Sequence, residues 1–201
     1  MTKKRKLRIL AAGDLHGDSR LSEKLAERAE REKVDLVILT GDISGMVETQ
    51  NLIRPFVRRK EKVLFVPGNW ESPETAEFFE KFYGIKNLDN YSLDYGNIGV
   101  FGAGNAEKLF VDEDEIFAKL KRNFEKIKNL EKKIMVTHMH PAGTKSELSG
   151  FPGSKGIRKA IKQFKPDLVL SGHIHELEGV EDKIGKTRII NVGRKGRIIE
   201  I

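Results

Sequence analysis

All five histidines of the 201-residue chain fall in three short segments that also contain an aspartate or a second histidine. The segments are Asp14-Leu15-His16, His138-Met139-His140 and His173-Ile174-His175. Residues two apart in extended backbone point to the same side, so both side chains of each pair can reach one site. Imidazoles and carboxylates that converge are typical metal ligands. The histidines therefore predict a metal centre.

Two further segments carry ligand-type side chains, Gly41-Asp42 and Gly68-Asn69-Trp70-Glu71. Each of the five segments directly follows a short apolar run that reads as a β-strand. Ligands of an α/β sheet bind at the carboxyl ends of its strands, so we expect the five segments to meet there. A glycine stands before Asp14, Asp42, Asn69 and His173, and it allows the chain to turn sharply as it leaves the strand.

The elements that must position these residues follow the alternation of strands and helices typical of an α/β domain. We expect strands at 7–12, 34–40, 62–67, 92–95, 98–102, 134–137, 166–171, 187–192 and 197–201. Helices are expected at 21–31, 45–59, 73–82, 112–128 and 153–164. A second sheet is expected to begin near Tyr91. Since no linker or repeat interrupts the pattern, residues 1–201 are expected to form a single domain.

Local signals give three finer expectations about the ends of these elements. Ser19 or Ser22 is expected to cap the first helix. Ser72, followed by Pro73, is expected to cap the third helix. The last two strands are expected to form a hairpin around residues 193–196.

Composition narrows the function classes further. The chain is 38% hydrophobic and 33% charged, as in a soluble globular protein, and it has no cysteine, which excludes disulfides, thiolate metal sites and iron–sulfur clusters. The net charge of +7 favours anionic partners, but no aromatic residues interleave the basic ones, so nucleic acid is not the favoured partner. Without a signal peptide or a long apolar stretch, the protein is expected to be cytoplasmic, with no membrane partner. Nothing indicates its oligomeric state.

The donor set consists of nitrogen and oxygen, which suits Mn, with Fe, Zn, Co or Ni as alternatives, better than Ca or Cu. The five segments supply more donors than one ion can bind. Two divalent ions about 3.5 to 4 Å apart that share a carboxylate and a bridging water would use them, and such centres hydrolyse phosphoesters. The positive charge of two ions exceeds the negative charge of two carboxylates, so the centre would attract a phosphate.

The order of Asp14-x-His16, Gly41-Asp42, Gly68-Asn69, His138 and Gly172-His173-x-His175 resembles the calcineurin-like metallophosphoesterase superfamily, in particular its small bacterial and archaeal members. The resemblance implies a four-layer α-β-β-α sandwich with two central mixed β-sheets and helices outside. It also implies that one ion is bound by Asp14, His16 and His175. The second ion would be bound by Asn69, His138 and His173. Asp42 would bridge the two ions.

One position departs from the pattern of that superfamily. The third motif usually continues as Gly-Asn-His, and this histidine contacts the phosphate and can protonate the leaving oxygen, whereas the chain has Trp70. Since tryptophan cannot act as an acid, His140 becomes the candidate catalytic proton donor. The alternative is that His140 orients a metal ligand. Glu71 is expected to accept hydrogen bonds near the ligands, or else merely to start the helix at Pro73.

The leading hypothesis is a metal-dependent phosphoesterase in which a metal-bridging hydroxide attacks phosphodiesters or activated phosphomonoesters, with a nucleotide as one candidate substrate. A second hypothesis is a non-catalytic scaffold that keeps the fold and binds proteins. A third is a nuclease, for which 201 residues leave little room for DNA-binding elements. Intact ligands argue against the scaffold, because a protein that needs no metal has no reason to keep all seven.

Overall fold

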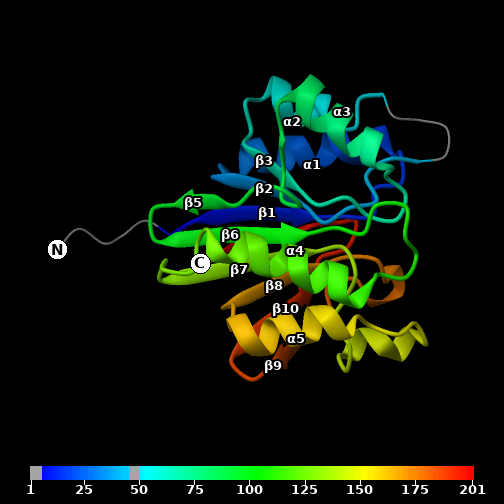
Figure 1. The fold of residues 1–201 in the computed structure, drawn as a ribbon. Coiled ribbons are helices and arrows are strands. Elements are labelled where there is room, and N and C mark those ends of the chain that lie inside the picture. The colour runs from blue at the N-terminus through cyan, green and yellow to red at the C-terminus, as the bar shows by residue number, and fades with distance from the viewer. Residues whose placement is uncertain (1–5, 46–49) are drawn as a thin grey trace.

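Two β-sheets stack face to face, and helices cover the outer face of each in the computed structural model, which describes residues 6–45 and 50–201 (Figure 1). In the first sheet the strand order is β11-β1-β2-β3-β4, with β11 antiparallel to β1 and the other neighbours parallel. Its strands are β1 (Arg8–Ala12), β2 (Leu36–Leu39), β3 (Val63–Phe65), β4 (Lys86–Asn87) and β11 (Arg197–Glu200).

The second sheet has the strand order β5-β6-β7-β8-β10-β9. Its edge strands β5 and β9 run antiparallel to their neighbours, and the inner strands are parallel, so this sheet is also mixed. The strands are β5 (Leu93–Tyr95), β6 (Ile98–Ala103), β7 (Lys132–Thr137), β8 (Leu168–Ser171), β9 (Glu181–Ile184) and β10 (Thr187–Asn191). As expected near Tyr91, the second sheet begins with β5.

The helices lie on the two outer faces. The first sheet is covered by α1 (Ser19–Arg31), α2 (Arg54–Arg58) and α3 (Pro73–Tyr83), and the second by α4 (Glu113–Glu125) and α5 (Lys155–Phe164) (Figure 1). Two short 3₁₀ helices, η1 (Lys145–Ser149) and η2 (His175–Leu177), lie in loops. No helix of the described residues is long and apolar enough to cross a membrane.

Three apolar cores separate the four layers. In β1, Ile9 and Ala11 point into the core between the sheets, whereas Leu10 and Ala12 point into the core under α1 and α2. Successive side chains of a strand point to opposite faces, so a strand with a core on each side must be apolar throughout. A third core, built around Phe101, lies between the second sheet and its helices. The predicted four-layer sandwich of two mixed sheets is confirmed.

Of the two predicted helix N-caps, one is confirmed and one is wrong. Ser72 caps α3 as predicted, with its side chain accepting a hydrogen bond from the backbone N–H of Thr75. The prediction of Ser19 or Ser22 for α1 is wrong, because the Asp18 side chain accepts the N–H of Leu21 at 2.9 Å. A carboxylate also gains from the positive end of the helix dipole, which a hydroxyl does not match.

Two predicted elements differ from the structure. Of the helix expected at 45–59, the described residues form only the short α2, and residues 46–49 lie outside the described part. The terminal hairpin is also wrong. β10 pairs with β8 and β9 in the second sheet, whereas β11 pairs with β1 in the first, so residues 193–196 carry the chain between sheets. A turn signal marks a change of direction but does not say which strand pairs with the one that follows.

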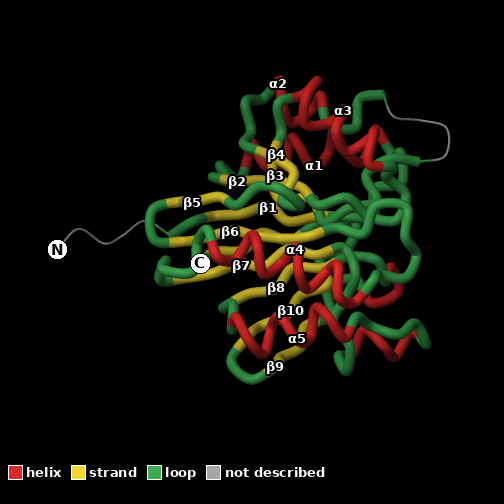
Figure 2. The backbone as a smooth tube through the Cα atoms, in the orientation of Figure 1, coloured by secondary structure: helices red, strands yellow, loops and turns green. Residues whose placement is uncertain are grey.

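Loops from both sheets gather at one edge of the sandwich, on the right of Figure 2. The parallel strands of the two sheets point toward this edge, so the carboxyl ends of β1, β2, β3, β7 and β8 meet there. The five ligand-bearing segments follow these strands.

Candidate metal centre

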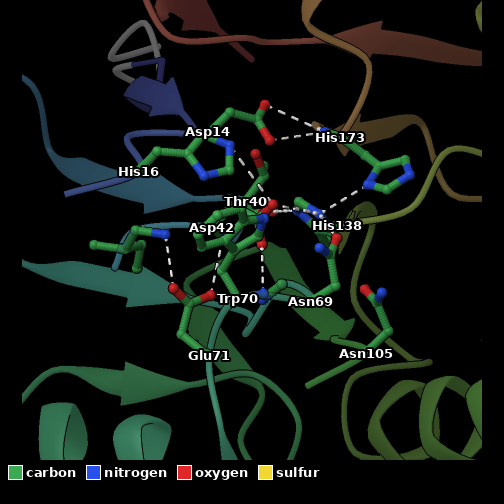
Figure 3. A network of polar contacts seen from close by, with 12 residues as sticks. Asp14, His16, Thr40, Asp42, Asn69, Trp70, Glu71, Asn105, His138 and His173 are labelled. Atoms are coloured by element: carbon green, nitrogen blue, oxygen red, sulfur yellow. Dashed lines mark hydrogen bonds and ion pairs between the residues drawn. The ribbon is translucent and has the colours of Figure 1, made fainter. Parts of the chain in front are cut away.

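The structure brings together all seven side chains that the sequence predicts as ligands. From the first sheet come Asp14, His16, Asp42 and Asn69, and from the second His138, His173 and His175. Figure 3 shows several of them converging between the ends of the strands. His140 lies next to them, with its ring 6.3 Å from that of His173.

A first group of donors consists of Asp14, His16 and His175. The Nε2 atoms of His16 and His175 lie 3.1 Å apart, and His175 Nε2 lies 3.7 Å from Asp14 Oδ1. Asp14 is fully buried, whereas His175 is exposed, so this group opens to solvent on the histidine side.

A second group consists of Asp14, Asp42 and His138, all buried. His138 Nε2 lies 3.4 Å from Asp42 Oδ2, 3.0 Å from Asn69 Oδ1 and 3.1 Å from His173 Nδ1. The donors of each group lie within 4.8 Å of one another, and Asp14 belongs to both groups. Asp42 also touches both, because its Oδ2 lies 3.7 Å from His16 Nε2.

The sharp turns that aim these side chains are made by the ligand residues themselves. Asp14, Asp42 and His173 have left-handed φ angles of 55°, 50° and 73°. A non-glycine residue in that region costs roughly 1 kcal/mol or more, and such strain concentrates at functional sites. Gly41 is also left-handed, at 96°, and a Cβ there would lie 2.6 Å from the backbone nitrogen of Gly68. The close approach of the two ligand loops therefore requires glycine.

Glu71 holds two of these loops together from behind. Its fully buried carboxylate accepts hydrogen bonds from the backbone N–H groups of Asp42, Ile43 and Ser44, from the Ser44 hydroxyl and from the N–H of Gly68. Burial raises the pKa of Glu71, while these donors oppose the rise by stabilising the charged form. The expectation that Glu71 accepts hydrogen bonds near the ligands is confirmed.

The orientation of His138 is set by a group that the sequence analysis missed. The Nδ1–H of His138 donates to the carbonyl oxygen of Thr40 at 2.8 Å, which leaves Nε2 to face the ligand oxygens. A second hydrogen bond that sets the tautomer is a common feature of metal-binding histidines. No sequence signal could reveal it, because every residue has a carbonyl oxygen.

Electrostatics at the centre favour a bound cation. Burial alone would lower the pKa of His138, but the carboxylates of Asp42 and Asp14 outweigh it and raise the pKa to about 9. Burial and the neighbouring His138 lower the pKa of His173 to about 4. The buried carboxylates thus stabilise a positive charge at one point of the site, and a metal cation satisfies the same field.

The donor set fits divalent metal ions in a second respect. Unprotonated imidazole nitrogens repel one another, yet two pairs of them lie 3.1 Å apart, which a shared proton or a common cation relieves. Carboxylate, imidazole and carboxamide donors without a thiolate suit Mn, Fe, Zn or Co. The residues therefore fit the metals that the sequence predicted.

Trp70 occupies the mouth of the centre. Its backbone N–H donates to Asp42 Oδ1 at 3.0 Å, and its carbonyl accepts from Ser44 Oγ at 3.3 Å, so its backbone is fixed (Figure 3). Its side chain is 44% exposed and lies edge-on against the ring of His16 at 5.0 Å.

His140 is fully buried, and its Nε2 lies 3.3 Å from the carbonyl oxygen of Phe151. Burial lowers its pKa, which disfavours the protonated form that a proton donor needs. Its place beside His173 suits a residue that orients His173, and it suits a proton donor only when the ring is protonated.

Two side chains near the centre had no role in the sequence analysis. Arg194 pairs with Asp18 at 3.2 Å, and its charge is among the causes that lower the pKa of His16, after burial and His175. Asn105 is buried, and its backbone N–H donates to the carbonyl oxygen of Pro67 at 3.1 Å, two residues before Asn69. Neither has a sequence motif, because each reaches the site through a loop whose path depends on the fold.

A four-layer sandwich with acidic and histidine ligands at the strand ends defines a class of metal-binding phosphoesterases. The model of the calcineurin-like phosphoesterase family matches residues 7–177, so the chain belongs to this family of hydrolases that act on phosphoesters. No curated protein sequence matches the chain significantly.

Solved structures share the fold at low sequence identity. The protein TT1561 of Thermus thermophilus has a TM-score of 0.76 at 19% identity, covering 97% of this chain and 99% of that one. GAP50, the anchor in the inner membrane complex of Plasmodium, has a TM-score of 0.62 at 13% identity, covering 94% and 72%. An archaeal phosphodiesterase has a TM-score of 0.56 at 17% identity, covering 96% and 99%.

Proposed function

We propose that the chain is a metal-dependent phosphoesterase with a dinuclear centre, which hydrolyses phosphodiesters or activated phosphomonoesters. The observation that carries the proposal is the pair of donor groups that share Asp14, each with its donors within 4.8 Å of one another. Mn is the expected metal, with Fe, Zn, Co or Ni as alternatives. The protein is expected to act as a cytoplasmic single domain.

The candidate ligands would bind two ions. One ion would be held by Asp14, His16 and His175, the other by Asn69, His138 and His173, with Asp42 between them. Bound divalent ions supply Lewis-acid activation of the phosphoryl group and of the attacking water. Thr40 and Glu71 hold His138 and Asp42 in place, so the ligands need little reorganisation.

Trp70 and His140 set the choice of leaving group. With Trp70 at the mouth, the chain has no acid at that position, which favours esters whose leaving group departs without a proton. His140 remains the proposed proton donor, supported by its place beside His173. If His140→Ala leaves hydrolysis of a poor-leaving-group ester unchanged while His138→Ala abolishes it, the acid role is wrong.

The direct test is hydrolysis of bis-p-nitrophenyl phosphate by protein stripped of metal and reloaded with Mn. A metal-dependent rate, with about two ions bound per chain by elemental analysis, is the expected result. Full occupancy by metal without any rate on this ester or on p-nitrophenyl phosphate would contradict the proposal.

The scaffold alternative keeps one supporting observation, the structural likeness to the anchor protein GAP50. It predicts bound metal without catalysis, or no metal at all. The nuclease alternative predicts cleavage of single-stranded DNA and an affinity that falls steeply with salt. The same protein preparation tests both alternatives.

A further inference from the structure

Aromatic side chains stand beside both halves of the centre. Next to His16 is Trp70, the single tryptophan of the chain, whose ring is held by a fixed backbone and is nearly half exposed. An exposed aromatic ring leaves apolar surface unburied, so at the mouth of a polar site the ring is available to pack against a flat part of a ligand.

The second aromatic feature is a stack of two rings beside His173. Phe151 lies edge-on against the His173 ring at 4.9 Å, and Phe110 stacks on Phe151 at 5.4 Å with an interplanar angle of 8°. Phe151 is partly buried against the core under α4 and α5, whereas Phe110 is 60% exposed. Phe110 therefore presents a ring to solvent in an orientation fixed by the ring beneath it.

These two features come from separate loops. Trp70 lies between β3 and α3, Phe110 between β6 and α4, and Phe151 between η1 and α5. Because each touches a histidine of the centre directly or through one ring, a phosphate held there would have an aromatic surface near each side.

We infer that the centre takes phosphodiesters that carry a flat aromatic ring, namely nucleoside esters, with the base stacked on Trp70 and a second aromatic substituent directed to Phe110. This inference rests on the proposed function and names its substrate class.

Physical chemistry favours a base over other apolar groups at these positions. Base–aromatic stacking accepts every base and strengthens binding by roughly 5- to 150-fold per base. An acyl chain gains mainly from an enclosed groove, whereas Trp70 and Phe110 offer open ring faces. The net charge of +7 also suits an anionic ligand that is not fully neutralised by the metals.

The first test compares two esters with the same leaving group, thymidine 5′-(p-nitrophenyl phosphate) and methyl p-nitrophenyl phosphate, with the metal-loaded protein. We expect kcat/KM to be about tenfold or more higher for the nucleoside ester. Trp70→Ala should lower this ratio at least about fivefold, and Trp70→Phe should retain most of it. Phe110→Ala should lower kcat/KM for both esters alike and leave the ratio unchanged, because both carry the p-nitrophenyl ring.

Phe82 provides a matched control. Like Phe110 it is a highly exposed phenylalanine, at 62%, stacked on another one, Phe78, at 5.0 Å, but it lies on α3. Phe82→Ala should leave both the ratio and the basal rate unchanged. Thermal unfolding of each variant checks that the substitutions at exposed rings leave the fold intact.

A second test needs no turnover, because Trp70 is the only source of tryptophan fluorescence. Adenosine 5′-monophosphate should change the emission of the metal-loaded protein saturably, whereas ribose 5-phosphate, which lacks the base, should change it much less. Equal responses to the two ligands would overturn the inference.

The outcomes separate the inference from the proposed function. If both esters are hydrolysed at equal kcat/KM, or the ratio is unchanged in Trp70→Ala, the inference is wrong and the phosphoesterase stands. If neither ester is hydrolysed with metal bound, the proposed function fails and the inference fails with it.

Discussion

The two halves of the candidate metal centre are built in different ways. The half from the first sheet supplies both carboxylates and the carboxamide, and its loops at Asp42 and Gly68 are joined by five hydrogen bonds to the buried Glu71. The half from the second sheet supplies three imidazoles, His138, His173 and His175. Its loop around Ile174 is held by fewer side-chain contacts, one from Asn191 Nδ2 to the Ile174 carbonyl at 2.7 Å and one from the His173 N–H to the Asp14 carboxylate.

This difference matches two requirements of the site, rigid support for buried charges and adaptability to the substrate. Buried carboxylates must be rigid, because a charge in a low-dielectric site that loses its partners costs several kcal/mol. Imidazoles can be neutral, so their loops tolerate a lighter support and border the more exposed aromatic surface at Phe151 and Phe110. The first half fixes the charge of the centre, and we expect the second half to adapt to the substrate.

The largest effect should come from Asp42, which contacts histidines of both groups. Asp42→Asn keeps the shape but removes the charge, and we expect activity to fall by about three orders of magnitude or more, because charge stabilisation at such centres is worth several kcal/mol. Metal content should fall as well, measured by elemental analysis after dialysis. Asp94→Asn, at an exposed position of β5, is the matched control and should change neither quantity.

The support of the first half is tested by Glu71→Ala. The change leaves five donors without their acceptor, and we expect a loss of about 3 to 5 kcal/mol in the free energy of unfolding, measured by urea denaturation. Glu77→Ala, at an exposed ion pair of α3, should cost about 0.5 kcal/mol or less. A similar loss of unfolding free energy in both variants would show that Glu71 does not hold the two loops together.

The equivalent change in the second half is Asn191→Ala. Losing one buried hydrogen bond should cost about 1 to 2 kcal/mol of unfolding free energy. Urea denaturation under the conditions used for Glu71→Ala makes the two values comparable. A cost as large as that of Glu71→Ala would break the comparison between the halves.

The smallest effect is expected for Trp70→His, which places an acid at the mouth of the first half. A well-placed general acid contributes about 10²- to 10⁴-fold, so even an imperfect one should raise the rate on a phenyl ester by about tenfold relative to a p-nitrophenyl ester. The measured quantity is the ratio of the two rates, and Trp70→Phe is the control. An unchanged ratio would mean that no proton is needed at this position.

The first-sheet ligands and the alternation of strands and helices could be read from the chain, whereas the four-layer sandwich is implied by the resemblance of its motifs to a known family. Strands buried on both faces are apolar throughout, and polar ligand residues interrupt them at their ends, so β1, β2 and β3 with Asp14, Asp42 and Asn69 stand out in a local pattern. Ser72 as a helix cap follows from the same kind of local chemistry.

Which strands pair, and which residues support the candidate ligands, are properties of the whole fold. Whether β11 pairs with β10 or with β1 depends on which sheet edge offers free backbone groups. The turn residues between the strands do not indicate that edge.

The sequence by itself identified the candidate metal ligands, because ligand chemistry resides in residue types and their spacing. Only the tertiary structure decided what surrounds them. Glu71 accepts hydrogen bonds from two loops, the Thr40 carbonyl orients His138, and Phe110 meets Phe151 from another loop. Each of these contacts joins residues far apart in the chain or uses a backbone atom common to all residues, so packing alone creates it.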